Sequence, residues 1–133
     1  MNAAEQRLLT YLGPAGSFTH AAIDLLATPW TGRVEPRDSV ADVIFSVESG
    51  EAEAGLVPLE TSVEGDVSST IDELIFRSSM CFINEEVVVP VNYVVAGTTG
   101  ARAAGIDRLV TTTAAAAQCR RFIEAADAEV VFV

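Results

Sequence analysis

Short apolar runs alternate with amphipathic or alanine-rich stretches along most of this chain, a pattern typical of strands that alternate with helices. The apolar runs predict strands at residues 8–12, 33–36, 54–58, 81–89, 107–110 and 130–133, with a further extended segment at 91–96. The stretches between them predict helices, with their caps, at residues 17–27, 38–50, 67–77, 101–105 and 111–126. This order predicts an α/β fold with largely parallel strands and right-handed crossovers.

Pro90 interrupts an apolar run and marks a crossover near residues 88–91. We therefore expect a first α/β lobe at residues 1–89 and the beginning of a second at residues 90–133. The apolar run at 130–133 has no capping turn after it, and a domain rarely ends on a bare buried strand. The pattern thus favours a chain that is part of a larger protein.

Composition limits which classes of molecule this protein is expected to bind. Half of the 133 residues are apolar, the net charge is −11, and all eight basic residues are arginine. Nucleic acid is disfavoured as a partner because phosphate neutralisation needs a basic patch. An anionic substrate would need local positive potential from backbone N–H groups or from arginine.

Targeting and redox signals are few. Cys81 and Cys119 lie far apart without metal-ligand spacing, which favours two reduced, buried thiols. The first residues have no apolar signal region, and no apolar run approaches the length of a membrane span. A cytoplasmic protein is the expectation.

The first candidate site is the turn formed by Gly13, Pro14, Ala15, Gly16 and Ser17. A glycine turn between a strand and a helix N-terminus can aim backbone N–H groups at a carboxylate or phosphate. An ordinary strand–helix turn with a capping serine explains the same residues. His20, the only histidine, could act as a general acid or base, or could be a hydrogen-bonded helix residue.

The second candidate site follows the strand at 54–58, where Glu60, Thr61 and Ser62 crowd its exit. In open α/β sheets, ligands bind beyond the carboxyl ends of the strands. Glu60 could act as a general acid or base or orient a hydroxyl, and Thr61 and Ser62 could bind a carboxylate. The alternative is that these three residues make the hydrogen bonds that the loop backbone needs and cap the next helix.

The third candidate pairs Thr111 with Gln118, which lies seven residues further on. That separation is two helical turns, so both side chains could face one cleft. Hydroxyl capping of an alanine-rich helix, with a chance glutamine, is the alternative.

Together these three stretches resemble motifs of the prephenate dehydratase family. Tyr11–Ala22 is similar to the family's Tyr-Leu-Gly-Pro-x-Gly opening, Pro58–Val67 to its Glu-Asn-Ser loop, and Thr111–Cys119 to its Ser-His-Pro-x-Ala-Leu-x-Gln-Cys segment. The resemblance implies two α/β lobes like those of type 2 periplasmic binding proteins, with the site in the cleft between them. The second lobe is then incomplete in this chain.

The resemblance also implies an activity: conversion of prephenate to phenylpyruvate, water and carbon dioxide in phenylalanine biosynthesis, without cofactor or metal. It implies that Glu60, Thr61, Ser62 and Gln118 are catalytic. The residues implied to bind substrate are Gly13, Pro14, Ala15, Gly16, Ser17 and Thr111. A homo-oligomer is expected, with no nucleic acid or membrane partner.

Several positions depart from the family pattern. Thr61 replaces the family's asparagine, Thr112 and Thr113 replace His-Pro, and Tyr93 stands where a histidine is usual. The Thr-Arg-Phe motif with the family's expected catalytic threonine, and the regulatory ACT domain, would lie beyond Val133. We therefore expect little turnover from these residues alone. The alternative function is a non-catalytic module that binds a small carboxylate or an aromatic amino acid.

Overall fold

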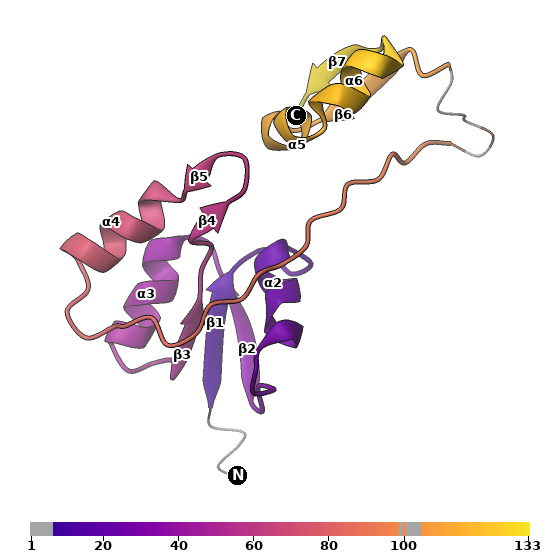
Figure 1. The fold of residues 1–133 in the computed structure, drawn as a ribbon. Helices are drawn as coiled ribbons and strands as arrows, with labels where there is room; N and C mark the ends of the chain where they lie inside the picture. Colours follow the sequence, from indigo (N-terminus) through magenta and orange to yellow (C-terminus); the bar gives the residue numbers. More distant parts are fainter. Residues whose placement is uncertain (1–6, 99, 101–104) are drawn as a thin grey trace. The chain divides into compact units, whose positions relative to one another are not determined.

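The computed structural model describes residues 7–98, 100 and 105–133 (Figure 1). The chain divides into two compact units, a first unit at Met1–Pro90 and a second unit at Val91–Val133. Each unit contains parallel strands joined through helices, so the α/β class predicted from the sequence is confirmed. That the units are lobes of one enzyme domain stays a prediction.

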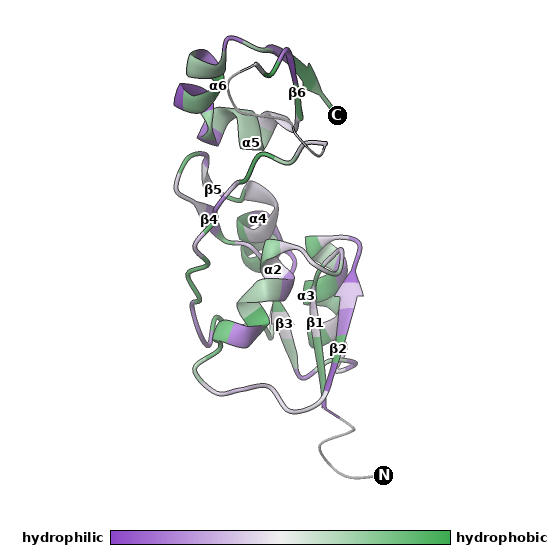
Figure 2. Ribbon diagram, turned by 90° about the vertical axis from the view of Figure 1, so that its right-hand side faces the viewer, coloured by the Kyte–Doolittle hydropathy of each residue, from purple (hydrophilic) through white to green (hydrophobic). Residues whose placement is uncertain are grey.

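A three-stranded parallel sheet forms the centre of the first unit. Strand β1 (Leu8–Leu12) lies between β2 (Arg33–Arg37) and β3 (Ala54–Leu56), giving the order β2-β1-β3. The central strand is the most apolar of the three, and Leu9 and Tyr11 are each only 2% exposed. Figure 2 shows the contrast with β2, whose residues are mostly hydrophilic.

Helix α3 (Val40–Glu48) packs against all three strands and covers the core. Val40, Val43 and Ile44 are buried, and Val47 is half-buried, which confirms the apolar face predicted from their spacing. Ser39 caps the helix through its side-chain oxygen, and Gly50 follows its end with a φ of 76°. A buried hydroxyl pair, Thr10 with Ser46 at 2.8 Å, joins β1 to α3.

The remaining elements of the first unit surround this core. They are α2 (Phe18–Ala22), the 3₁₀ turn η1 (Ile23–Leu25), the hairpin β4 (Glu60–Thr61) and β5 (Gly65–Asp66), and α4 (Ser68–Phe76). Helix α4 packs against α3. The helix predicted through residue 27 ends at Ala22, because the chain tightens into η1.

The strand predicted at 81–89, with its extension at 91–96, is wrong as a strand. Residues 81–97 contain no strand, and the chain there runs extended without a ladder (Figure 1). A strand requires a neighbour to accept and donate its backbone hydrogen bonds, and the described residues supply none here. The strand predicted at 54–58 likewise ends at Leu56.

The second unit is a β-α-β arrangement. Strand β6 (Arg108–Thr111) pairs in parallel with β7 (Glu129–Phe132), as predicted within a residue or two. The single helix expected between them is instead two, α5 (Thr113–Gln118) and α6 (Arg120–Ala126), because Cys119 leaves the helical conformation at ψ 19°. The helix predicted at 101–105 lies almost wholly outside the described residues.

Among the residues described, no helix is both long enough and apolar enough to cross a membrane.

Candidate active site

Two of the predicted site segments leave the sheet of the first unit at the same edge. The turn at residues 13–17 follows β1, and the chain to Glu60 follows β3, its parallel neighbour. The carboxyl ends of parallel strands lie at one edge, where ligands of α/β sheets usually bind. Thr111 and Gln118 belong to the second unit, so their relation to these segments stays a prediction.

Internal hydrogen bonds hold the turn at residues 13–17 in shape. Ser17 caps α2 by accepting a hydrogen bond from the His20 N–H, and its hydroxyl donates to the Leu12 carbonyl at 3.2 Å. Gly16 has a φ of 85°, a conformation that favours glycine. The predicted strand–turn–helix geometry and the serine cap are therefore confirmed.

His20 stabilises this turn. Its Nδ1 accepts a hydrogen bond from the Gly16 N–H at 2.9 Å, so the neutral ring carries its proton on Nε2. Its ring also stacks on Tyr11, with centroids 4.9 Å apart and planes 9° apart. These contacts support the second interpretation of His20, that of a hydrogen-bonded structural residue.

The same contacts limit how the turn can bind an anion. The Gly13, Gly16 and Ser17 N–H groups donate to the Arg37 carbonyl, to His20 and to the Pro14 carbonyl. Because these donors are already satisfied, they add little to an anion site. A role for residues 13–17 in substrate binding therefore rests on the Ala15 N–H, which has no acceptor among the described residues, and on the shape of the turn.

The Glu60–Ser62 segment forms one side of the β4–β5 hairpin. Thr61 Oγ1 accepts a hydrogen bond from the Glu64 N–H at 2.9 Å, which closes the hairpin turn. Glu60 and Ser62 are exposed, and neither side chain has a hydrogen-bond partner among the described residues. The bond of Thr61 agrees with the structural alternative but does not exclude a role in binding, which stays a prediction. The predicted capping of the next helix is absent, because the residue before α4 is Val67, without a side-chain cap.

Thr70, which the sequence reasoning missed, ties the start of this segment to α4. It is fully buried, and its hydroxyl donates to the Pro58 carbonyl at 2.6 Å. A second bond runs from the Val67 N–H to the Leu59 carbonyl at 2.8 Å. No sequence pattern marks Thr70, because its partner lies twelve residues away across the hairpin.

In the second unit, Thr112 is the N-cap of α5 and accepts from the Ala115 N–H at 3.3 Å. Thr111 ends β6, and Gln118 is the last residue of α5 and is exposed. The argument that helical spacing aligns Thr111 with Gln118 is therefore wrong, because Thr111 belongs to a strand. Whether both bind substrate stays a prediction.

The basic side chain at the end of β2 is already paired. Arg37, at the end of β2, pairs with Glu51 at 2.6 Å and with Glu35 at 3.3 Å, so its positive charge is offset. Hydrogen bonds from Arg33, and then from Arg37, lower the pKa of the Glu35 carboxyl. Among the described residues, no group of three histidine, cysteine or acidic side chains could hold a metal ion.

Comparison with known proteins places these segments in a family. The family model described as prephenate dehydratase matches residues 9–133, which is nearly the whole chain. The chain belongs to the prephenate dehydratase family. The family match confirms the resemblance found in the three sequence motifs.

Two curated members illustrate the similarity. The prephenate dehydratase of Mycobacteroides abscessus is 35% identical over 131 residues, covering 92% of this chain and 42% of that protein. The bifunctional chorismate mutase/prephenate dehydratase of Aquifex aeolicus is 31% identical, covering 87% of this chain and 31% of that protein. The chain thus spans less than half the length of these relatives.

Solved structures agree on the fold. The prephenate dehydratase of Arthrobacter aurescens, solved in complex with L-Phe, is 33% identical with a TM-score of 0.76, covering 95% of this chain and 42% of that one. The Staphylococcus aureus enzyme is 24% identical with a TM-score of 0.77, covering 95% of this chain and 47% of that one. At that identity, the second likeness concerns the fold alone.

Proposed function

We propose that this chain is part of a prephenate dehydratase, and that the whole protein converts prephenate to phenylpyruvate, water and carbon dioxide. The observation that carries the proposal is the match of the prephenate dehydratase family model to residues 9–133. The placement of residues 13–17 and 60–62 at one edge of the sheet is consistent with it.

The reaction needs positioning and charge stabilisation more than a cofactor. The ring carboxylate leaves as carbon dioxide while the ring hydroxyl leaves as water, and the electron pair of the broken C–C bond makes the ring aromatic. An enzyme must therefore hold two carboxylates and assist departure of the hydroxyl. Hydroxyl donors such as Thr61 and Ser62 suit the first task, and Glu60 suits proton transfer or orientation of the leaving hydroxyl.

The finer architecture is also part of the proposal. The two units would be lobes of a type 2 periplasmic-binding-protein-like fold, at about residues 1–89 and 90–133, with Thr111 and Gln118 facing the substrate from the second lobe. The division of the chain between Pro90 and Val91 supports this arrangement. The homo-oligomeric state expected from the sequence remains a prediction.

A prephenate turnover assay on the protein expressed from its full reading frame tests the activity, with phenylpyruvate as the readout. Glu60→Ala is expected to reduce kcat by a factor of about 100 or more if Glu60 transfers a proton. The matched control is Glu64→Ala, because Glu64 is an exposed carboxylate on the same hairpin whose side chain we expect to be solvated.

The outcomes separate the two candidate functions. Turnover that Glu60→Ala abolishes and Glu64→Ala preserves supports a catalytic Glu60. Unchanged kinetics of Glu60→Ala would return Glu60 to a structural role. Absence of turnover from the folded full-length protein would favour the non-catalytic module, and titration with prephenate and phenylalanine would then test binding. The chain of 133 residues assayed alone is expected to show little turnover.

A further inference from the structure

Glu48 has a carboxylate where helix electrostatics disfavours one. It is the last residue of α3, and the C-terminal end of a helix carries partial negative charge. No basic side chain among the described residues forms a salt bridge with it. A carboxylate at this position therefore needs other stabilisation.

That stabilisation comes from the four residues 78–81, which follow α4. Glu48 Oε1 accepts hydrogen bonds from the Ser79 N–H and hydroxyl, at 3.0 and 2.8 Å, and from the Met80 N–H at 3.1 Å. Glu48 Oε2 accepts from the Ser78 hydroxyl at 2.8 Å, the Cys81 thiol at 3.2 Å and the Met80 N–H at 3.2 Å. Residues 78–81 thus wrap around one anion.

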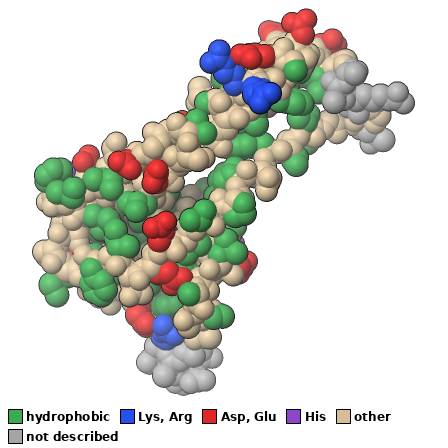
Figure 3. Space-filling view, viewed as in Figure 1, with side chains coloured by type: hydrophobic (Ala, Val, Ile, Leu, Met, Phe, Trp, Pro, Cys, Tyr) green, Lys and Arg blue, Asp and Glu red, His purple; other side chains and the backbone are tan. Residues whose placement is uncertain are grey.

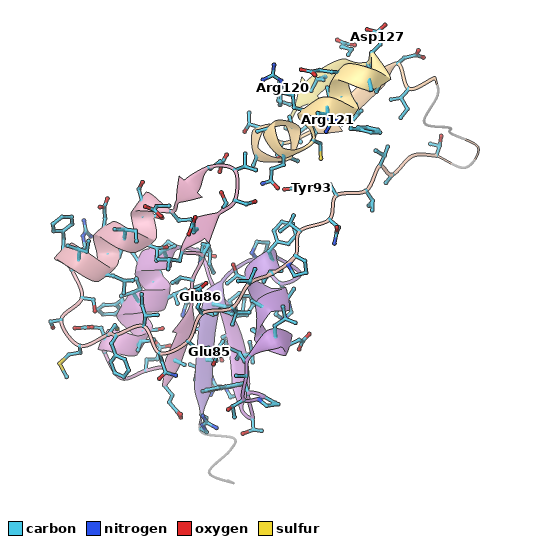
Figure 4. All side chains as sticks on the ribbon, viewed as in Figure 1. Glu85, Glu86, Tyr93, Arg120, Arg121 and Asp127 are labelled. Carbon is cyan, nitrogen blue, oxygen red and sulfur yellow. The ribbon has the colours of Figure 1, made fainter. Side chains whose placement is uncertain are left out.

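The chain beyond Cys81 has few other attachments. Residues 82–90 form no strand ladder, and Phe82, Ile83 and Val88 are more than 60% exposed. One tie occurs further along, where Glu85 Oε1 accepts from the Ala27 N–H at 2.7 Å. Figure 4 labels Glu85 and Glu86 on this extended segment, which continues to the boundary between the units at Pro90.

We propose that Glu48 is the anchor that fixes where the connecting segment leaves the first unit. Its six contacts, two of them shared by one N–H, hold residues 78–81 against the end of α3. Glu85 then holds the middle of the segment. Because no ladder secures residues 82–90, loss of the Glu48 carboxylate detaches the start of the segment while the sheet stays folded.

The consequence for activity rests on the proposed function. If residues from both units bind one substrate, a detached connection lowers the fraction of molecules that are ready to bind it. The apparent dissociation constant rises as that fraction falls. Glu48 is therefore a positioning residue that affects KM more than kcat.

Hydrogen exchange of the full-length protein tests the anchor without any assay of activity. Glu48→Ala is expected to accelerate exchange by about tenfold or more in peptides spanning residues 78–81, where the Ser79 and Met80 N–H groups bond the carboxylate, with β1, β2 and β3 unchanged. Glu48→Gln keeps one carbonyl oxygen for the Ser79 and Met80 N–H groups and should restore part of the protection. The matched control is Glu51→Ala, which removes an exposed carboxylate that pairs with Arg37 instead.

Two results would overturn the anchor: unchanged exchange at residues 78–81 in Glu48→Ala, or equally faster exchange throughout the first unit. In the turnover assay, a raised KM with a nearly unchanged kcat supports the positioning role, and a loss confined to kcat contradicts it. If the wild-type protein shows no turnover, the proposed function fails, while the exchange result still decides whether Glu48 is an anchor.

Discussion

At the scale of single residues, three side chains of the first unit accept hydrogen bonds that indicate their structural role. His20 accepts from the Gly16 N–H, Thr61 from the Glu64 N–H, and Glu48 from the residues that follow α4. Each is an acceptor for a backbone N–H that needs a partner in a turn. Thr61 keeps its own hydroxyl proton, so its structural bond is compatible with donation to a substrate carboxylate.

The Glu48 contacts predict a specific dependence of stability on pH. Hydrogen bonds from the Ser79 backbone, and then from the Ser78 and Ser79 hydroxyls, lower the pKa of Glu48 from 4.5 to about 2. A carboxyl whose pKa is lower in the folded state stabilises the fold above its unfolded pKa, and that stabilisation is lost as pH falls through the folded value. The difference in unfolding free energy between wild type and Glu48→Ala should therefore be constant above about pH 5 and shrink between pH 4.5 and 2.

Urea unfolding at several pH values, compared for these two proteins, measures this difference. Glu51→Ala is again the control, because it removes an exposed carboxylate that pairs with Arg37 and does not contact residues 78–81. A difference that stays constant down to pH 2 would show that Glu48 contributes by packing and not by its charge.

At the scale of elements, the β4–β5 hairpin carries the predicted catalytic residues on a firmly held base. The bond from Thr70 to the Pro58 carbonyl and the bond from Val67 to the Leu59 carbonyl attach it to the start of α4. Its tip, at residues 62–64, is exposed. The hairpin can thus present Glu60 and Ser62 to a ligand while its base stays in place.

Thr70→Val tests this attachment by removing the hydroxyl at nearly constant volume. The Pro58 carbonyl loses its donor, so the free energy of unfolding should fall by about 1–3 kcal/mol. Thr70→Ser keeps the hydroxyl and should recover most of the loss. Equal destabilisation by both variants would assign the effect to the methyl group, and chemical denaturation with both proteins decides between them.

At the scale of the whole molecule, high negative charge coexists with exposed apolar side chains. The net charge is −11, and Phe82, Val88 and Val94 are 81%, 78% and 88% exposed on the extended segment. Figure 3 shows hydrophobic side chains over much of one face, with acidic side chains between them. Apolar chain without a ladder partner is prone to pair with other chains, and net charge opposes such association.

We expect the 133-residue chain to self-associate as pH approaches its sequence pI of about 4.3, because the repulsion then vanishes. Val88→Lys should reduce that association, as measured by light scattering. Asn92→Lys adds the same charge on the same segment without removing an apolar side chain, so it is the matched control. Equal reduction by both variants would mean that charge alone, and not the apolar side chain of Val88, controls association.

Local sequence patterns predicted much of the fold. The caps at Ser17 and Ser39, the apolar face of α3 and the strands β1, β2, β6 and β7 follow from patterns within about ten residues. The motifs that resemble the prephenate dehydratase family also predicted the family, which the family-model match confirmed. These features depend on backbone propensity and on side-chain order, which the sequence contains directly.

The errors occurred where a distant partner decides the outcome. Residues 81–89 have strand-forming composition, yet a strand exists only where another chain segment completes its ladder. The buried donor Thr70 and the anchor Glu48 act on residues twelve and about thirty positions away. The sequence by itself determined the α/β pattern, the caps and the family, whereas only the tertiary structure decided these pairings, because they depend on which segments meet in space.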